Sequence, residues 1–119
     1  MDKFRPETFL PLTPVAFEIL LALADGERHG YSILQEVESR SGGAVSLHAG
    51  TLYRALARLL ESDLIDELSE SPDPSNGDER RRYYKLTVRG IAVARAEITR
   101  LEGQLAAARS RRLLKGARA

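Results

Sequence analysis

The spacing of the apolar residues changes twice along this chain, and that change constrains the fold more than any other feature. The leucines Leu52, Leu56, Leu59 and Leu60 recur at the intervals of one face of a helix. The segments LIDELSE and RRRYYKLT that follow are typical of two short strands. Helical spacing then returns after Thr87 for roughly 25 residues. The sequence therefore predicts helices, then a β-hairpin, then one long helix.

Capping residues set the expected boundaries of the helices. Thr13 followed by proline suits an N-cap and the first helical position, and Gly26 suits the C′ position of the same helix. The next helix is expected to place Tyr31, Leu34 and Val37 on one apolar face. We predict an irregular arm or short helix at 1–12, helices at 14–25, 30–40 and 49–62, an extended stretch at 44–47, strands at 64–70 and 80–87, and the long helix after residue 87. The predicted scaffold residues are Leu20, Leu23, Leu34, Leu52, Leu56, Leu59, Ile65 and Leu86.

Composition excludes several classes of protein. A chain of 119 residues with 43% hydrophobic and 29% charged residues is expected to form one domain with its own core. No apolar run reaches the roughly 18 residues of a membrane span, and the N-terminal MDKFRPETF lacks the apolar stretch of a signal peptide. We therefore expect a cytoplasmic protein without a membrane partner. The absence of cysteine excludes a disulfide framework, a thiol nucleophile and a thiolate zinc site.

The net charge of +1 hides a strong segregation of charge. Residues 61–79 contain eight acids and no bases, whereas residues 80–85 contain four bases and no acids. The last stretch, residues 103–119, contains five bases and no acids. The sequence pI of about 8.1 is below the value above 9 that marks a strongly basic nucleic-acid binder. Local clustering, rather than total charge, is therefore the relevant signal.

The predicted order of elements is that of a winged helix-turn-helix. The third helix is the expected recognition helix, whose N-terminal residues reach base edges in the major groove, and the hairpin is the wing. We expect Thr51 and Arg54 at base edges or adjacent phosphates, His48 and Tyr53 at the entry of the helix, and the wing arginines on phosphates or in the minor groove. The predicted DNA-binding residues are His48, Thr51, Tyr53, Arg54, Arg58, Arg80, Arg81 and Arg82.

The long helix carries a second signal. Its apolar residues repeat at intervals of three and four, as in a coiled coil, and its length of about 37 Å would extend past a small domain. We therefore expect a homodimer. The predicted dimer interface consists of Phe9, Leu10, Ile91, Ile98, Leu101 and Leu105.

The fold class expected is mainly α with a small β-hairpin: a winged helix-turn-helix domain with an N-terminal arm at residues 1–86, and a C-terminal dimerisation helix with a basic tail at 87–119. An effector cavity is expected between the last helices and the N-terminal segment, lined by Phe4, Phe9, Leu10, Ile98 and Leu101. Its apolar lining favours a planar hydrophobic or aromatic compound. Full packing of this surface, with no effector, is the alternative.

The blocks LTPVAFEILLALADGERHGYSILQEVE, GTLYRALARLLESDLI and DERRRYYKLTVRG, in this order, resemble PadR-type transcriptional regulators. The resemblance covers about residues 10–115. The single short C-terminal helix resembles that of the smaller branch of the family. It implies a dimeric repressor that binds a palindromic operator, with the C-terminal helix as the dimerisation element. One departure is Ala49, where the family often has proline, which leaves the start of the recognition helix less defined.

Several interpretations of the same residues remain open. Arg54 and Arg58 are also compatible with a solvated helix face, and one or two of the wing arginines are expected to pair with the acidic run before them. Tyr53 either bonds a phosphate or covers the junction of helix and wing. His29 is expected to cap or pack at the start of the second helix. No metal site, cofactor or catalytic residue is predicted, since two histidines 19 residues apart do not form a zinc-binding pattern.

Three other functions compete with the DNA-binding hypothesis. A winged helix sometimes serves as a protein–protein module without DNA, and failure to shift any DNA at low salt would favour that function. A MarR-type regulator shares the winged helix, but usually has dimerisation helices at both ends. A small hydrolase using His29 with Ser32 is the third, although no set of nucleophile, base and orienting group is visible.

Overall fold

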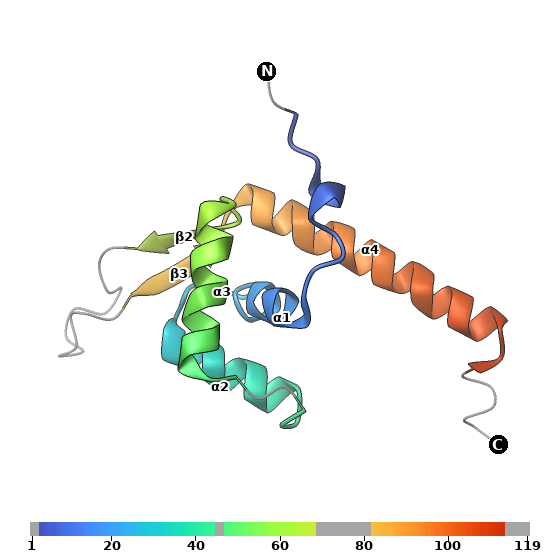
Figure 1. Ribbon diagram of the computed structural model, residues 1–119, viewed down its shortest axis with the longest axis horizontal. Coiled ribbons are helices and arrows are strands. Elements are labelled where there is room, and N and C mark those ends of the chain that lie inside the picture. The colour runs from blue at the N-terminus through green and yellow to red at the C-terminus, as the bar shows by residue number, and fades with distance from the viewer. Residues whose placement is uncertain (1–2, 45–46, 69–81, 114–119) are drawn as a thin grey trace.

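The computed structural model describes residues 3–44, 47–68 and 82–113. Figure 1 shows a small helical body with a sheet at one side and a long helix that extends away from the opposite side. The elements in chain order are the 3-10 helix η1 (Pro6–Phe9), α1 (Pro14–Ala22), β1 (Arg28–His29), α2 (Gly30–Arg40), α3 (Ala49–Glu61), β2 (Ile65–Leu68), β3 (Tyr83–Leu86) and α4 (Val88–Ser110). No helix in these described ranges is long and apolar enough to cross a membrane.

The starts of three helices are fixed by side-chain caps. The Thr13 side chain accepts a hydrogen bond from the Ala16 amide at the start of α1. His29 Nδ1 accepts one from the Ser32 amide at the start of α2, and Thr87 Oγ1 accepts one at the start of α4. Each bond satisfies a backbone donor that lacks a partner within the helix. The caps predicted at Thr13 and Thr87, and the capping role of His29, are confirmed.

The end of α1 differs from the prediction. The helix ends at Ala22 with Leu23 as its C-cap, so Gly26 is not the C′ residue. Arg28 accounts for the early end, because its Nε donates a 2.7 Å hydrogen bond to the Ala22 carbonyl. This bond replaces the backbone amide that another turn of helix would supply to that carbonyl. Gly26 instead adopts a φ of +142° in the loop that follows, a conformation that side chains disfavour.

The sheet has three antiparallel strands in the order β1-β3-β2. The sequence predicted the hairpin, whose described strands are shorter than expected, at 65–68 and 83–86, and a short extended stretch at 44–47. The third strand is Arg28–His29, which pairs with Tyr84 and Tyr83. It is not the stretch at 44–47, of which residues 45 and 46 lie outside the described ranges. The outer parts of the predicted strands, and the connector between them, also lie outside.

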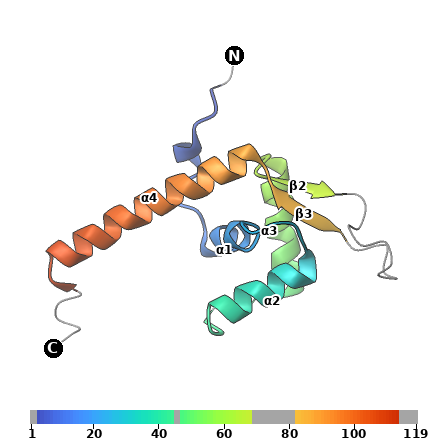
Figure 2. The same cartoon turned by 180° about the vertical axis from the view of Figure 1, so that it is seen from behind.

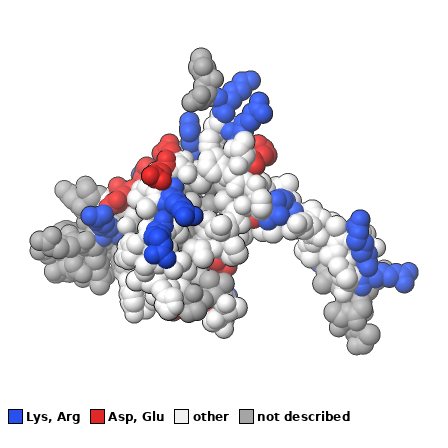
Figure 3. All heavy atoms as spheres, viewed as in Figure 1, with Lys and Arg blue, Asp and Glu red and all other residues white. Residues whose placement is uncertain are grey.

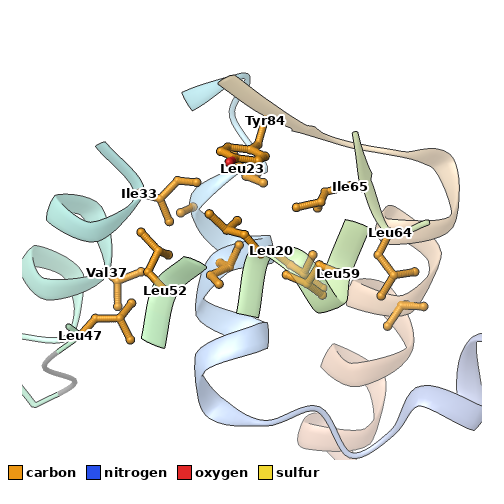
Figure 4. Packing of buried hydrophobic residues seen from close by; sticks show 14 residues of the cluster. Leu20, Leu23, Ile33, Val37, Leu47, Leu52, Leu59, Leu64, Ile65 and Tyr84 are labelled. Carbon is orange, nitrogen blue, oxygen red and sulfur yellow. The ribbon is translucent and has the colours of Figure 1, made fainter. Parts of the chain in front are cut away.

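The core forms where α1, α2, α3, the sheet and the first part of α4 meet (Figure 4). Leu52, Leu56 and Leu59 are buried along one face of α3, as predicted. In β3 the alternation makes Tyr84 a core residue, with Tyr83 only half-buried. The fourteen buried core residues are Ile19, Leu20, Ala22, Leu23, Ile33, Val37, Leu47, Leu52, Leu56, Leu59, Leu64, Ile65, Tyr84 and Val93.

The start of α4 is held tightly against the turn after α3. Thr87 Oγ1 donates to the Asp63 carbonyl at 2.7 Å, and the Thr87 amide donates to the Leu64 carbonyl at 3.1 Å. A Cβ atom added to Gly90 would lie 2.0 Å from the Leu64 oxygen, so this approach requires glycine. From this anchored end, α4 runs past α1 and out of the body (Figures 1 and 2).

Candidate nucleic-acid interface

The outward face of α3 is polar and open. Figure 3 shows basic side chains over α3, with acidic side chains flanking them toward β2. The same helix that buries Leu52, Leu56 and Leu59 exposes its other side, as its sequence periodicity predicts. Beyond Ala49 and Gly50 in the first turn, the exposed residues are Tyr53, Arg54, Ala57, Arg58 and Glu61.

Arg54 and Arg58 carry charges that no acid neutralises within the described part of the chain. The Arg54 Nη2 atom donates a long hydrogen bond of 3.5 Å to Thr51 Oγ1. The other end of the guanidinium lies over Gly50, where an added Cβ would be 3.7 Å from Nη1. Arg54 therefore lies along the first turn of α3, next to the hydroxyl group of Thr51, the other residue expected at base edges or adjacent phosphates.

Tyr53 packs against α2, a contact that neither of the two roles left open by the sequence includes. Its ring packs against the first turn of α2, because a Cβ on Gly30 would come within 2.5 Å of the Tyr53 hydroxyl oxygen. Half of the side chain nevertheless remains exposed, at 51%. The residue thus packs on α2 at Gly30 while it presents a phenol to the outside. His48 precedes α3 in an extended conformation, is exposed, and makes no side-chain cap.

Tyr31, which shares the three-residue spacing of Leu34 and Val37 and was not among the predicted DNA-binding residues, belongs to this surface. Tyr31 is 61% exposed, and the apolar face of α2 is formed by Ile33 and Val37 instead. Tyr31, His48 and Tyr53 line the same hollow of about 300 Å³ between the first turns of α2 and α3. The sequence contained a signal for the position of Tyr31, since in a helix-turn-helix the first turn of the second helix lies beside the start of the third helix. The interval of three residues from Tyr31 to Leu34 and Val37 favoured a place on the apolar face of the helix instead.

One of the three wing arginines lies within the described residues. Arg82 Nε pairs with Glu67 Oε2 across the hairpin at 3.2 Å, which agrees with the expectation that one or two of them engage the acidic run. The Arg82 side chain is 71% exposed, and exposed pairs of this kind contribute little and exchange readily. Arg80 and Arg81 lie outside the described ranges.

Tyr84 lies beside the Arg82–Glu67 pair. Burial and the nearby Glu67 carboxylate raise the pKa of the Tyr84 hydroxyl group, which favours its protonated form.

The predicted dimer residues on α4 form an exposed apolar stripe. Ile91, Ile98, Leu101 and Leu105 are each between 37% and 46% exposed. Phe9 and Leu10 differ from them, because both are half-buried and pack against the core of their own chain. A pocket of about 320 Å³ at Phe9 is lined by the N-terminal segment, α1 and α3, and not by Ile98 or Leu101. It is therefore not the effector cavity that was expected between the last helices and the N-terminal segment.

The opposite face of α4 contains a buried carboxylate. Glu97 is 2% exposed and accepts hydrogen bonds from Arg100 Nε at 2.7 Å and Nη2 at 2.8 Å. The Arg100 guanidinium lowers the pKa of Glu97, and a hydrogen bond from the Leu12 backbone acts in the same direction. Glu97 therefore lies where the N-terminal segment packs along α4.

The catalytic alternative gains no support from the geometry. His29 Nδ1 bonds the main chain of Ser32, and the Ser32 hydroxyl accepts a hydrogen bond of 2.9 Å from Arg28 Nη1. The two side chains are thus used in capping α2 and in anchoring Arg28. Among the described residues, no group of three or more His, Asp and Glu side chains is placed to hold a metal ion.

Comparison with known proteins is consistent with this architecture. The model of the transcriptional regulator PadR-like family matches residues 19–96. A PadR family transcription regulator from Clostridium difficile R20291 has a TM-score of 0.65 at 28% identity, over 86% of this chain and 99% of that one. Bacillus subtilis PadR, solved in complex with operator DNA, has a TM-score of 0.63 at 22% identity, over 74% of this chain and 48% of that one.

A curated relative in Lysinibacillus sphaericus, called uncharacterized protein X, is 32% identical over 74 residues, which is 62% of this chain. The chain spans between 24% and 65% of the length of the curated relatives that it matches. The predicted fold, a winged helix-turn-helix followed by a long C-terminal helix, is confirmed.

Proposed function

Because this chain belongs to the transcriptional regulator PadR-like family, we propose that it is a sequence-specific DNA-binding regulator that acts as a homodimeric repressor at a palindromic operator. The observation that carries the proposal is the exposed face of α3. Two arginines without acidic partners in the described chain, Arg54 and Arg58, lie there beside Thr51. Unpaired cations on a recognition helix are suited to phosphates and to the acceptor atoms of guanine.

Each side chain of this face has a proposed role. Thr51 and Arg54, in the first turns of α3, contact base edges or adjacent phosphates. His48 and Tyr53, at the entry of the helix, contact the backbone, and Tyr31 joins them because it lines the same hollow. Arg58 and the wing arginines at 80–82 neutralise phosphates. Tyr53 also packs on α2 at Gly30.

The proposed dimer forms through α4. The stripe at Ile91, Ile98, Leu101 and Leu105 is exposed in one protomer, and apolar side chains at coiled-coil spacing gain free energy by packing on a second copy. Phe9 and Leu10 would contribute only their exposed edges. In a symmetric dimer two recognition helices about 34–36 Å apart match half-sites one turn of DNA apart. The proposed division is a DNA-binding part at 1–86 and a dimerisation part at 87–119.

Selection of DNA from a random-sequence pool tests this function. We expect the enriched sequence to be an inverted repeat whose half-site centres are about 10–10.5 base pairs apart. Bound DNA should be retarded in a gel at low salt as a complex of two protomers. If no sequence is enriched and no DNA is retarded at 50 mM salt, the winged helix serves a protein partner instead.

A further inference from the structure

Two exposed tyrosines meet at one place on the surface of the helical body. Among the described residues before α4, Tyr31 and Tyr53 are the only large apolar side chains that are exposed. They belong to different helices, yet both line the hollow of about 300 Å³ between the first turns of α2 and α3. We call it the tyrosine hollow. Large apolar side chains that are exposed together, rather than singly, indicate a contact surface.

The lining of the tyrosine hollow is mostly apolar. Leu34, Leu47, Ala49 and Leu52 contribute to it alongside the two tyrosines, and Leu47 and Leu52 are buried members of the core. No Lys, Arg, Asp or Glu is among the described residues that line it, and its polar side-chain atoms belong to His48 and to the tyrosine hydroxyl groups. An apolar group is therefore the occupant that this lining stabilises, whereas a charge would lose its hydration there.

The tyrosine hollow adjoins the residues that are proposed to contact DNA bases. Ala49, part of its lining, is the first residue of α3. The Arg54 guanidinium lies over the next residue, Gly50, and donates to the Thr51 hydroxyl group. The hollow and these polar groups therefore share the first turn of α3. If this turn enters the major groove, it brings the hollow to the edges of the bases.

Thymine is the base whose major-groove edge carries an apolar group. Its 5-methyl group projects into the groove, whereas guanine, adenine and cytosine present acceptors or amino donors at their edges. An amino or carbonyl group placed against Leu47 and Leu52 would lose its hydrogen bonds with water and gain none from their side chains. Burial of a methyl group has no such cost and is favourable. The hollow exceeds the volume of one methyl group, which leaves room for the adjoining edge of the pyrimidine ring.

Two other occupants suit the tyrosine hollow less well. A DNA phosphate would gain little inside it, because Arg54 and Arg58 are not part of its lining. The hydroxyl groups of Tyr31 and Tyr53 remain available for the proposed backbone contacts, since a methyl group needs only the rings and the leucines. A segment of a protein partner would also use the apolar lining, but Arg54, which has no acidic partner in the described chain, favours a polyanion beside the hollow.

We propose that the tyrosine hollow receives the 5-methyl group of one thymine in each operator half-site, and that the ring of Tyr31 makes binding depend on this thymine. The inference rests on the proposed function and adds the recognition of a particular base to it. Tyr31 is the better residue to test, because Tyr53 also packs against Gly30. Since Tyr31 is more exposed than Tyr53, its replacement removes a contact with DNA and leaves the core of the protein intact.

Deoxyuridine is the probe, because it differs from thymidine only by the loss of the 5-methyl group. The operator selected from the random pool is made with deoxyuridine at one thymine position of each half-site at a time, and its binding to the intact protein is measured by fluorescence anisotropy. At one position we expect the operator Kd to rise about fourfold for each half-site, the effect of one buried methyl group, and about fifteenfold for both. A selected half-site without any thymine would contradict the inference.

Variants of the protein show whether that methyl group lies in the tyrosine hollow. In Tyr31→Ala the fourfold ratio between the deoxyuridine and thymine operators should fall below about twofold per half-site, because the methyl group then buries less apolar surface. Tyr31→Phe keeps the ring and should keep the ratio, even where loss of the hydroxyl group weakens both complexes. Thr51→Ala is the matched control on α3, because Thr51 does not line the hollow, and it should weaken both complexes by the same factor. A ratio that persists in Tyr31→Ala would place the methyl group elsewhere.

Failure of this inference is distinguishable from failure of the proposed function. If the protein binds a selected operator but no deoxyuridine substitution has an effect that depends on Tyr31, the thymine assignment is wrong and the DNA function stands. If Tyr31→Ala and Tyr31→Phe weaken the operator equally and the wild type does not distinguish thymine from deoxyuridine, the hollow contacts the DNA backbone alone. If no DNA is enriched or retarded at low salt, the proposed function is wrong and the thymine assignment is wrong with it.

Discussion

The helices α3 and α4 are both amphipathic, but α3 leaves its charged face exposed, whereas α4 leaves an apolar face exposed. On α3 the leucines are buried and the cations are exposed. On α4 the buried positions include the charged Glu97 beside Val93, while Ile91, Ile98 and Leu101 are exposed. The difference indicates different partners, because an open cationic face gains from a polyanion and an open apolar face gains from another apolar surface.

The two faces are joined by a rigid connection. The close approach of Gly90 to the Leu64 carbonyl and the hydrogen bonds of Thr87 to Asp63 and Leu64 bind the start of α4 to the turn that ends α3. A dimer formed along α4 would therefore set the spacing of two α3 helices directly. In such a dimer the position of the apolar face of α4 would determine how the cationic face of α3 is presented to DNA.

The largest expected effect is that of salt, which should weaken DNA binding by the α3 face and leave dimerisation through the α4 stripe unchanged. If each dimer makes roughly six to ten phosphate contacts, operator affinity should fall by a factor of about 10³–10⁵ between 50 and 200 mM salt. The dimer should be stable over the same range, since burial of apolar surface is not screened. Fluorescence anisotropy of labelled DNA and sedimentation of the protein alone measure the two effects. A flat response of DNA binding to salt would contradict the assignment of α3.

A charge in the stripe of α4 should have the next largest effect. Leu101→Asp would place a carboxylate in the proposed dimer seam, which should weaken dimerisation by at least about a hundredfold because the charge loses its hydration there. Analytical ultracentrifugation should find a monomer, or aggregates, at concentrations where the wild type is a dimer. Gln104→Asp adds the same charge at another exposed position of α4 and serves as the control. A stable dimer of Leu101→Asp would place the interface elsewhere.

Loss of single arginines should distinguish sequence reading from general attraction. Arg54→Ala should weaken the selected operator by about 1–3 kcal/mol and relax its sequence preference. Arg81→Ala should weaken all DNA nearly equally and reduce the salt slope by about one. Arg5→Ala removes the same charge from the N-terminal arm and serves as the control. Equal losses on operator and random DNA for both Arg54→Ala and Arg81→Ala would refute this division of roles.

The buried carboxylate of α4 should give the smallest effect, seen in the pH dependence of stability. Because Arg100 lowers the pKa of Glu97 in the folded protein, ionised Glu97 stabilises the fold above the pKa of a free glutamate, about 4.3. This contribution is lost as the pH falls through the lower, folded pKa.

Thermal unfolding between pH 7 and pH 3 tests the role of Glu97. The midpoint of the wild type should fall more steeply on acidification than that of Glu97→Gln, with a difference of a few degrees. Glu102→Gln, an exposed change on the same helix, should follow the wild-type curve. Parallel curves for Glu97→Gln and the wild type would show that the Arg100 pair contributes nothing to stability.

Much of the fold follows from features that are local in the sequence. The leucine spacing of α3 fixed its buried face, and Thr13 and Thr87 marked the starts of α1 and α4, because helix periodicity and capping depend on residues within one or two turns. The same locality made the exposed face of α3 predictable, including Arg54 and Arg58. The apolar stripe of α4 could be predicted for the same reason.

Contacts between distant segments were decided only in three dimensions. The strand Arg28–His29 is too short to carry an alternation of its own, and it exists because β3 offers it a partner. Tyr31 shares the spacing of a buried residue but is exposed, because α2 buries its adjacent face instead. One pocket is lined by Phe9, Val15 and Arg58, which come from three segments, and the sequence of each segment alone does not show that the three lie side by side. Sequence periodicity describes each element alone, whereas packing free energy depends on which elements meet.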